Sequence, residues 1–465
     1  MTETPAAVFD RLGAARPPEH PEVLFGTACV LGGSIAGLLA ARVLADHAER
    51  VVVIERDAVS GEGGPRAGVP QGRHVHVLLP GGLRWIEHWF PGFTREMQEE
   101  GAVLAGPEQS AIYRDGHRIH SGVDHLMASR PFMEAMIRAR VQGLRNVSVL
   151  RAQATGLEYR GDEVCGVRYR SGDRREVLPA GIVVDAMGRA SKLPDWLAAD
   201  GFDRPALQRL PTAINYATAS FKRAQRPEEL ALTNSVARFS PPYPADGVAV
   251  AVVTAIENDR WTSTLMGYDD VRPGRTPDAF RATSAKLPPP FAEVASHGPA
   301  EDIATYHQAE SRRRDFAGPG HFPARLVSAG DAVASFNPIY GQGMSSAALQ
   351  ASCLSEYLST GPDLQVPATG FFELQQVVVD AAWAMSAGGD AARLDALSGA
   401  EVPEEVSRQR RDMDQILRAT VVDADVLRAV EKVAAMVAHP STLTDPALLE
   451  QAIAANERWR IADMS

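Results

Sequence analysis

The stretch from Thr27 to Asp57, TACVLGGSIAGLLAARVLADHAERVVVIERD, constrains the fold of this chain more than any other. It predicts a strand, a tight glycine turn, a helix and a second strand that ends near an acid. This order is typical of a dinucleotide-binding βαβ unit. The pattern G-x-G-x-x-G falls on Gly32, Ser34 and Gly37, so a serine stands where the middle glycine is usual. We therefore expect a dinucleotide site in which one position departs from the pattern.

The glycine turn offers what a pyrophosphate needs. A helix N-terminus presents unpaired backbone N–H groups and about half a positive charge. We expect Gly32 to make the turn and Gly37 to let the helix pack against the strand, while the hydroxyl of Ser34 can donate to the phosphate. Glu55 follows Gly37 by 18 residues. Its carboxylate can accept from ribose hydroxyls and would repel a 2′-phosphate, so we expect no NADP site here. A glycine-rich turn in an unrelated α/β fold is the alternative.

Length and charge exclude several classes of protein. A chain of 465 residues allows two or three domains. The net charge of -11 argues against a nucleic-acid partner, which would favour a basic face. Three scattered cysteines favour a reducing, cytoplasmic setting over a disulfide framework or a zinc site. No run approaches the roughly 18 apolar residues of a membrane helix. We expect a cytoplasmic monomer or homodimer with no membrane segment.

The pattern along the chain predicts a nucleotide domain that is interrupted and then completed. We expect a mobile tail over residues 1–25 and the first part of the domain over 26–204. The β-rich runs and proline-heavy loops of 205–310 indicate a mainly antiparallel sheet, which forms the substrate domain. Strand, loop and helix return over 311–360, and residues 361–465 are helical. The predicted fold class is therefore α/β, a Rossmann-like domain interrupted by a β-sheet domain and followed by a helical region.

A second glycine stretch, SAGDAVASFNPIYGQGMSSAAL (Ser328 to Leu349), decides between NAD and FAD. Asp331 follows an apolar strand, where it can accept from the hydroxyls of a sugar alcohol. Pro338 stiffens the loop, and Gly341 to Met344 open a helix. Reduced flavin carries negative charge around N1, and a helix N-terminus with bare glycine amides suits that charge. This stretch favours FAD.

With both stretches in place, the chain resembles the FAD-dependent monooxygenases of the p-hydroxybenzoate hydroxylase type over about residues 26–455. Two segments, GVPQGRHVHVLLPGG and GDAVASFNPIYGQGM, are most similar to bacterial epoxidases and hydroxylases of polyketide and terpenoid pathways. The resemblance implies FAD as cofactor, with NADPH, NADH or a partner flavin reductase as electron source. It also implies transfer of one atom of O₂, through a flavin hydroperoxide, to a small apolar substrate in antibiotic biosynthesis. Alkene epoxidation and hydroxylation both stay open.

The resemblance also implies which residues hold FAD. The glycine turn would hold the pyrophosphate, Glu55 the adenosine ribose and Asp331 the ribityl chain, while Gly341 to Met344 would lie against the isoalloxazine ring. Asp185 opens a motif that fixes backbone near FAD. The full set of expected FAD-binding residues is Gly32, Gly33, Ser34, Gly37, Glu55, Arg56, Arg66, Arg130, Asp185, Asp331, Pro338, Gly341, Gln342, Gly343 and Met344.

The reaction itself assigns few side chains, because the cofactor supplies the reactive oxygen. Tyr340 is a candidate for substrate contact. Tyr216, Trp261 and Tyr268 are candidates for a substrate wall, with plain core packing as the alternative. We expect no metal site. The histidine that simple phenol hydroxylases carry after GDAA is missing, since Val333 follows Ala332.

Three other functions stay open from the sequence. An aromatic hydroxylase and an FAD-dependent reductase or dehydrogenase of an isoprenoid are both compatible with the cofactor motifs. A flavin-binding protein that captures a ligand without turnover is the non-enzymatic alternative. The W-x-W-x-I-P signature of flavin-dependent halogenases, which share this fold, is absent from the sequence. Consumption of reductant together with O₂ would separate a monooxygenase from the others.

Overall fold

The computed structural model describes residues 3–58, 64, 66, 68–223, 232–241 and 243–463. At its centre lies a five-stranded parallel sheet in the order β18-β12-β1-β2-β8. The strands are β1 (Phe25–Leu31), β2 (Ala48–Glu55), β8 (Val147–Arg151), β12 (Ile182–Asp185) and β18 (Leu326–Ser328). Strand β12 lies within the predicted first part of the nucleotide domain, and β18 joins the same sheet from the later segment 311–360.

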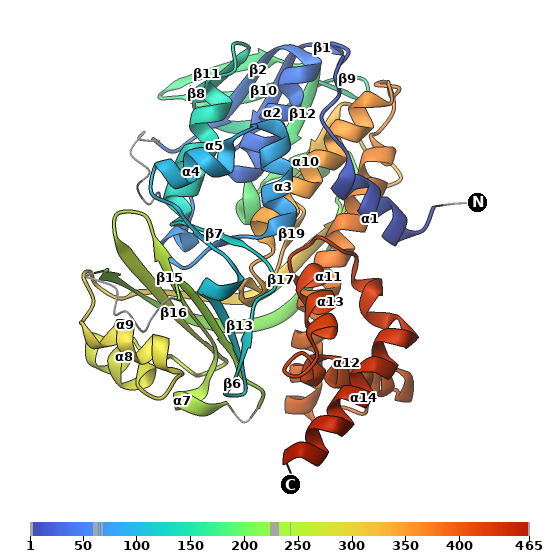
Figure 1. Ribbon diagram of the computed structural model, residues 1–465. Coiled ribbons are helices and arrows are strands. Elements are labelled where there is room, and N and C mark those ends of the chain that lie inside the picture. The colour runs from blue at the N-terminus through green and yellow to red at the C-terminus, as the bar shows by residue number, and fades with distance from the viewer. Residues whose placement is uncertain are drawn as a thin grey trace.

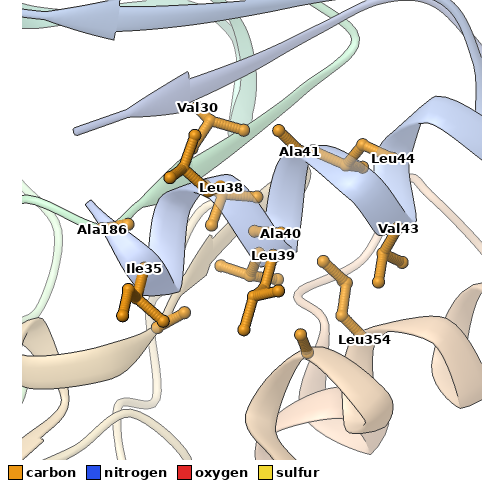
Figure 2. Close-up of a cluster of buried hydrophobic side chains, with 14 of the residues drawn as sticks. Val30, Ile35, Leu38, Leu39, Ala40, Ala41, Val43, Leu44, Ala186 and Leu354 are labelled. Atoms are coloured by element: carbon orange, nitrogen blue, oxygen red, sulfur yellow. The ribbon is translucent and has the colours of Figure 1, made fainter. Parts of the chain in front are cut away.

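Helix α2 (Ile35–His47) connects β1 to β2 and is apolar on nearly all sides. It packs between the sheet and α10 (Gly343–Ser359), with α5 (Arg130–Gln142) beside it. Figure 2 shows Leu38 of α2 close to Val30 of β1. On the opposite side of α2, Val43 lies near Leu354, which belongs to α10. A helix that is buried all round fixes both glycine motifs relative to one another, since α2 follows the first and α10 follows the second.

Smaller elements surround the parallel sheet. The hairpin-rich segment after β8 forms a three-stranded antiparallel sheet of β9 (Gln153–Arg160), β10 (Glu163–Ser171) and β11 (Arg174–Pro179). A second small sheet contains β3 (Val77–Leu78), β4 (Val103–Ala105) and β7 (His125–Met127). Helices α3 (Pro80–Trp89), α4 (Phe93–Glu99) and α6 (Leu193–Ala199) fill the remaining sides.

An eight-stranded sheet forms the second layer, below the parallel sheet in Figure 1. Its order is β19-β17-β13-β16-β15-β14-β5-β6. The strands are β5 (Ser110–Arg114), β6 (His117–His120), β13 (Ala206–Lys222), β14 (Asn234–Arg238), β15 (Val248–Ile256), β16 (Arg260–Tyr268), β17 (Ala304–Asp315) and β19 (Ala334–Ser335). All its pairs are antiparallel except β14 with β5.

The two faces of this sheet pack against different partners, because side chains alternate along a strand. One face carries Phe221 and Leu265 and is covered by α8 (Pro277–Ser284) and α9 (Pro289–Ser296). The other face carries Tyr216 and Tyr268 and contacts the flavin-domain loop that contains Ile339.

The C-terminal region is helical, as predicted. It consists of α11 (Thr369–Ser398), α12 (Glu404–Ala419), α13 (Ala424–Ala434) and α14 (Pro446–Asp463), and the last three share a small core of their own. Figure 1 shows these helices at the lower right, beside the eight-stranded sheet. Within the described ranges, no helix has the length and hydropathy needed to cross a bilayer.

Two expectations about chain organisation need correction. The expected mobile tail is wrong for residues 5–14, which form helix α1 (Pro5–Ala14). Thr4 caps this helix, and the three-residue spacing of Phe9 and Leu12 lets both bury completely against the core. The boundary between the domains also differs, because the hairpin of β5 and β6 lies within residues 26–204 and belongs to the eight-stranded sheet.

Candidate FAD and substrate site

The β1–α2 turn requires glycine at two positions. Gly32 has a φ of +101°, and a Cβ there would lie 2.5 Å from the Ala186 carbonyl oxygen. A Cβ on Gly37 would lie 1.8 Å from the Gly32 carbonyl oxygen. The turn and the start of α2 therefore approach each other as closely as backbone allows, which leaves the first amides of α2 facing outward without a side-chain cap.

Glu55 sits under this turn at the end of β2. Its side chain is buried and accepts from the backbone N–H of Gly33 at 2.8 Å and of Asp57 at 2.9 Å. Arg66 donates to Glu55 Oε2 at 3.0 Å. By contrast the neighbouring Arg56 is exposed, with its Nε 3.9 Å from a carboxylate oxygen of Asp57. Glu55 and Arg66 therefore line the turn, and Arg56 points toward solvent.

Ser34 is held by two residues of α5. Its hydroxyl donates to Glu134 Oε2 at 2.7 Å, and Arg130 Nη2 donates to the serine oxygen at 2.8 Å. Because the hydroxyl proton points at a carboxylate, it is directed away from the role of phosphate donor that we expected of it. Glu134 also lies within 3.2 Å of Arg130, 2.8 Å of Arg66 and 2.6 Å of Arg138. The three arginines outweigh the effect of burial and lower the pKa of Glu134, so it is ionised.

Two aspartates follow strands of the parallel sheet, and Asp185 is fully buried while Asp331 is partly exposed. Asp185 accepts from the backbone N–H of Met187 at 3.0 Å and from the Ser191 hydroxyl. Burial raises the pKa of Asp185 to about 6. Asp331 lies in a 3₁₀ turn after β18, where burial raises its pKa and Arg130 and Arg189 oppose the rise. Asp331 and Arg130 come from distant segments and lie within electrostatic reach of one another, which places the two glycine motifs around one site.

The start of α10 is open. Gly341 has a φ of +68°, and a Cβ on Gly341 or Gly343 would meet nothing within 4 Å. Gln342 precedes the helix without capping it, and its Oε1 is buried without a partner among the described residues. Met344 packs into the core below. Space above bare amides is what a planar ring with a developing negative charge requires.

A wall of tyrosines and aliphatic residues faces this opening from the eight-stranded sheet. Its tyrosines are Tyr216, Tyr243, Tyr268 and Tyr306, and its aliphatic members include Ile214, Val250, Val252 and Met266. Ile339, in the short 3₁₀ turn Pro338–Tyr340, packs against this wall. Beside it a hollow of about 180 Å³ reaches Tyr216 and Tyr306. The Tyr216 hydroxyl is buried and has no partner in the described part of the chain.

The structure separates the three candidates for the substrate wall. Tyr216 and Tyr268 lie in the wall, whereas Trp261 lies on the opposite face with the residues that α8 and α9 cover. Tyr340 is directed against α11, since a Cβ on Gly389 would lie 2.2 Å from the Tyr340 hydroxyl oxygen. We therefore leave Trp261 out of the proposed wall and keep Tyr340 at its edge.

Two arginines stand at one end of the wall. Arg238 on β14 donates to the Ile339 carbonyl at 3.0 Å, and its guanidinium lies 6.0 Å from the centre of the Tyr340 ring. Arg114 on β5 is its register partner. Neither forms an ion pair with a carboxylate among the described residues. Burial and the proximity of Arg238 lower the pKa of Arg114 to about 10. Both side chains are still cationic at neutral pH.

His74 and His76 lie on irregular backbone after a 3₁₀ turn, and no strand contains them. His74 Nδ1 is 2.7 Å from the Thr218 hydroxyl, and its ring packs against Tyr216 and Tyr306. His76 Nδ1 donates to the His74 carbonyl at 3.0 Å. Burial lowers the pKa of His74 to about 4 and that of His76 to about 3, so both are neutral near pH 7. His74 belongs to the wall as a weak base.

Comparisons with known proteins agree with this geometry. A sequence model of the family described as FAD dependent oxidoreductase matches residues 28–194. Protein Rv3254 of Mycobacterium tuberculosis (strain ATCC 25618 / H37Rv) is 35% identical in an alignment 349 residues long that covers 71% of this chain and 72% of the relative. The chain belongs to the FAD-dependent oxidoreductases. The family uses FAD, and the bare helix starts, Glu55 and the arginine cluster are residues that fit it.

Solved structures of the same fold include a monooxygenase and a flavin-dependent brominase. The p-nitrophenol 4-monooxygenase PnpA of Pseudomonas putida DLL-E4 is similar with a TM-score of 0.62 and 17% identity, over 90% of this chain and 99% of that one. The flavin-dependent brominase Bmp2 is similar with a TM-score of 0.61 and 15% identity, over 93% and 98%. The predicted fold class is thereby confirmed, while the chemistry of these two enzymes stays their own.

Sequence reasoning missed several residues of the site. Glu134 lies in α5, and its signal in the sequence is the four-residue spacing from Arg130 and Arg138. Arg114 and Arg238 are distant in sequence and become neighbours through strand pairing alone. Asp390, which accepts from Asn337 at 2.8 Å, comes from the C-terminal helices, for which no site was expected.

Proposed function

We propose that this oxidoreductase is a flavin-dependent monooxygenase that transfers one atom of O₂ to an apolar secondary metabolite. The observation that carries the proposal is the placement of the tyrosine wall against Ile339, next to the open start of α10. Bound FAD, once reduced, supplies the electrons with which O₂ is activated. The chain's own part is to bind the substrate over the α10 start and to exclude water there.

The wall favours an alkene over a phenol as the reacting group. Hydroxylation of a phenol is assisted by a base that takes its proton, whose pKa is about 10. His74 faces the wall, and a pKa of about 4 makes it a weak proton acceptor. Burial raises the pKa of Tyr216 and of Tyr268, so both hydroxyls are neutral donors. An electron-rich alkene of a polyketide or terpenoid needs no such base, so we propose its epoxidation, or hydroxylation through a rearranged epoxide.

The arginine end of the wall adds one property of the substrate. Two adjacent cations without a carboxylate partner favour a ligand that brings a negative charge. We therefore propose an apolar body with an acidic group, such as a polyketide or terpenoid acid, whose acidic end lies at Arg238 and Arg114. The electron donor is proposed to be NADPH, NADH or a partner flavin reductase.

Isotope labelling tests the proposal. The FAD-loaded protein, a reductant and a panel of unsaturated polyketide and terpenoid acids are incubated under ¹⁸O₂, and products are examined by mass spectrometry. One oxygen atom of O₂ enters the product and the other leaves as water, with two electrons from the reductant and two protons. The proposal would be wrong if the new oxygen came from water, or if the product had only lost or gained hydrogen. The reductase or dehydrogenase alternative would then take its place.

A further inference from the structure

Glu134 occupies the centre of a charge cluster beside the β1–α2 turn. Its side chain is 7% exposed, and four groups from three segments contact it: the Ser34 hydroxyl, Arg66, Arg130 and Arg138. Arg66 Nε is at ion-pair distance but lacks the alignment of a hydrogen bond. One carboxylate thus organises three cations and the residue that replaces the middle glycine of the motif.

The cluster leaves donors unused. Arg130 is 8% exposed, and its Nη2 donates to Ser34 and Glu134. Its Nε is buried and has no hydrogen-bond partner among the described residues. Arg138 likewise spends Nη2 on Glu134 and leaves Nη1 buried and unpaired within the described ranges. Buried guanidinium donors without acceptors cost free energy, so they indicate an anion that binds beside them.

We propose that Glu134 is a positioning residue for the pyrophosphate of FAD. It fixes the Ser34 hydroxyl and one edge of Arg130, so that the free N–H groups of that arginine face the phosphate at the start of α2. The Ser34–Glu134 pair then explains the departure from G-x-G-x-x-G, because a glycine would give the carboxylate nothing to hold. The inference rests on FAD binding by the family and is independent of the proposed monooxygenase reaction.

If Glu134 acted by repelling the pyrophosphate, its removal would change FAD affinity in the opposite direction. A carboxylate near a pyrophosphate also repels it, and a residue that acted only by repulsion would weaken FAD binding while present. Glu134→Gln keeps the shape of the side chain and removes its charge. The new amide N–H₂ group is a donor, so it cannot accept a hydrogen bond from the arginines. Positioning therefore predicts weaker FAD binding in this variant, and repulsion predicts tighter binding.

The test is a titration of the full chain with three ligands by calorimetry, after removal of FAD. Glu134→Gln should weaken FAD and ADP about tenfold or more, because both carry the pyrophosphate, and leave adenosine within about twofold. Glu134→Asp, which keeps the charge but withdraws it from Ser34 and Arg130, should also weaken FAD and ADP. Glu99→Gln, an exposed carboxylate of α4 paired with Arg95, is the matched control and should change nothing.

A double-variant cycle tests whether Glu134 acts through its partner. Ser34→Gly should weaken FAD modestly, and the double variant should be no worse than Glu134→Gln alone, because the two side chains form one unit. Tighter or unchanged FAD binding in Glu134→Gln would overturn the proposal. So would an equal loss for adenosine, which would indicate general damage to the fold, and melting temperatures without ligand provide the check.

Discussion

The two ends of the site handle charge in opposite ways. At the cofactor end, three carboxylates and three arginines pair with one another before any ligand is present: Glu55, Asp57 and Glu134 with Arg66, Arg130 and Arg138. At the substrate end, Arg114 and Arg238 have no carboxylate among the described residues, and the Tyr216 hydroxyl has no partner there. The ion pairs of the cofactor end hold the unused donors of Arg130 and Arg138 in place for a cofactor that is always the same. On our proposal, the acidic group of the substrate completes the charge of the two unpaired arginines at the substrate end.

The largest effect on stability and FAD retention is expected from a substitution that disturbs the backbone turn at the cofactor end. Gly37→Ala places a Cβ 1.8 Å from the Gly32 carbonyl oxygen, and neither backbone segment has room to withdraw. We expect the variant to lose at least about 3 kcal/mol of unfolding free energy and to purify without FAD. Denaturant titration and the flavin absorbance of the purified protein measure the two effects.

Gly13→Ala is the matched control for that variant. Gly13 is also helical, in α1, and a Cβ there would meet nothing within 4 Å. The control should keep FAD and gain up to about 1 kcal/mol, because alanine favours helix. Retention of FAD by Gly37→Ala would show that the turn tolerates expansion, and the close approach would not be what positions the cofactor.

A smaller effect is expected at the substrate end, where the network is open. Arg238→Met removes one of the two unpaired cations while keeping the apolar stem. We expect it to weaken binding of 2-naphthoate by about tenfold to a hundredfold and to leave 2-naphthamide unchanged, because only the acid carries a charge. Calorimetry on the FAD-loaded protein measures both without turnover.

Arg118→Met controls for the loss of an arginine from the same sheet, since Arg118 on β6 is exposed. Equal weakening of acid and amide by Arg238→Met would assign Arg238 a packing role. No weakening of either would remove the acidic group from the proposed substrate, while leaving the labelling experiment to decide the reaction class.

The cofactor end and the substrate end also differ in how far the sequence predicts them. The glycine turn, Glu55 and the open start of α10 depend on local backbone requirements, so G-x-x-x-x-G and GQGM reveal them directly. The tyrosine wall follows from strand alternation, but which face carries it does not, and Trp261 was placed with it for that reason. The Arg114–Arg238 pair depends on a parallel pairing between strands more than a hundred residues apart, which no local pattern encodes.

Helix α1 is an instructive miss at the N-terminus. Its apolar face is short, Val8, Phe9 and Leu12, and gives a weak periodic signal among prolines and charges. Its stability comes from packing on α10 and α11, which are formed by residues more than three hundred positions later. Tertiary contacts therefore order a segment that its own composition describes poorly.

The smallest expected effect is on the pH dependence of stability, to which one carboxylate at each end of the site contributes. Burial raises the pKa of Asp390 to about 6, although Asn337, Arg393 and Thr212 oppose the rise. Because the folded-state pKa exceeds the unfolded value of about 3.9, this group stabilises the fold fully below that value and loses its contribution as pH rises through 6. Glu134, whose pKa is lowered, acts in the other direction and loses its contribution as pH falls.

Asp390→Asn imitates the protonated state, since its amide can still accept from Asn337 and can donate to Thr212. At pH 4 the variant and the parent should be equally stable. At pH 7 the variant should be more stable by on the order of 1–2 kcal/mol, because one pKa unit corresponds to about 1.4 kcal/mol. Glu134→Gln should show the reverse, a deficit that is present at pH 7 and shrinks toward pH 4. Thermal unfolding in saturating FAD at five pH values measures both variants. Parallel curves for parent and Asp390→Asn would mean that Asp390 has the same pKa in the folded and unfolded states, and burial of this carboxylate at the substrate end would then carry no electrostatic cost.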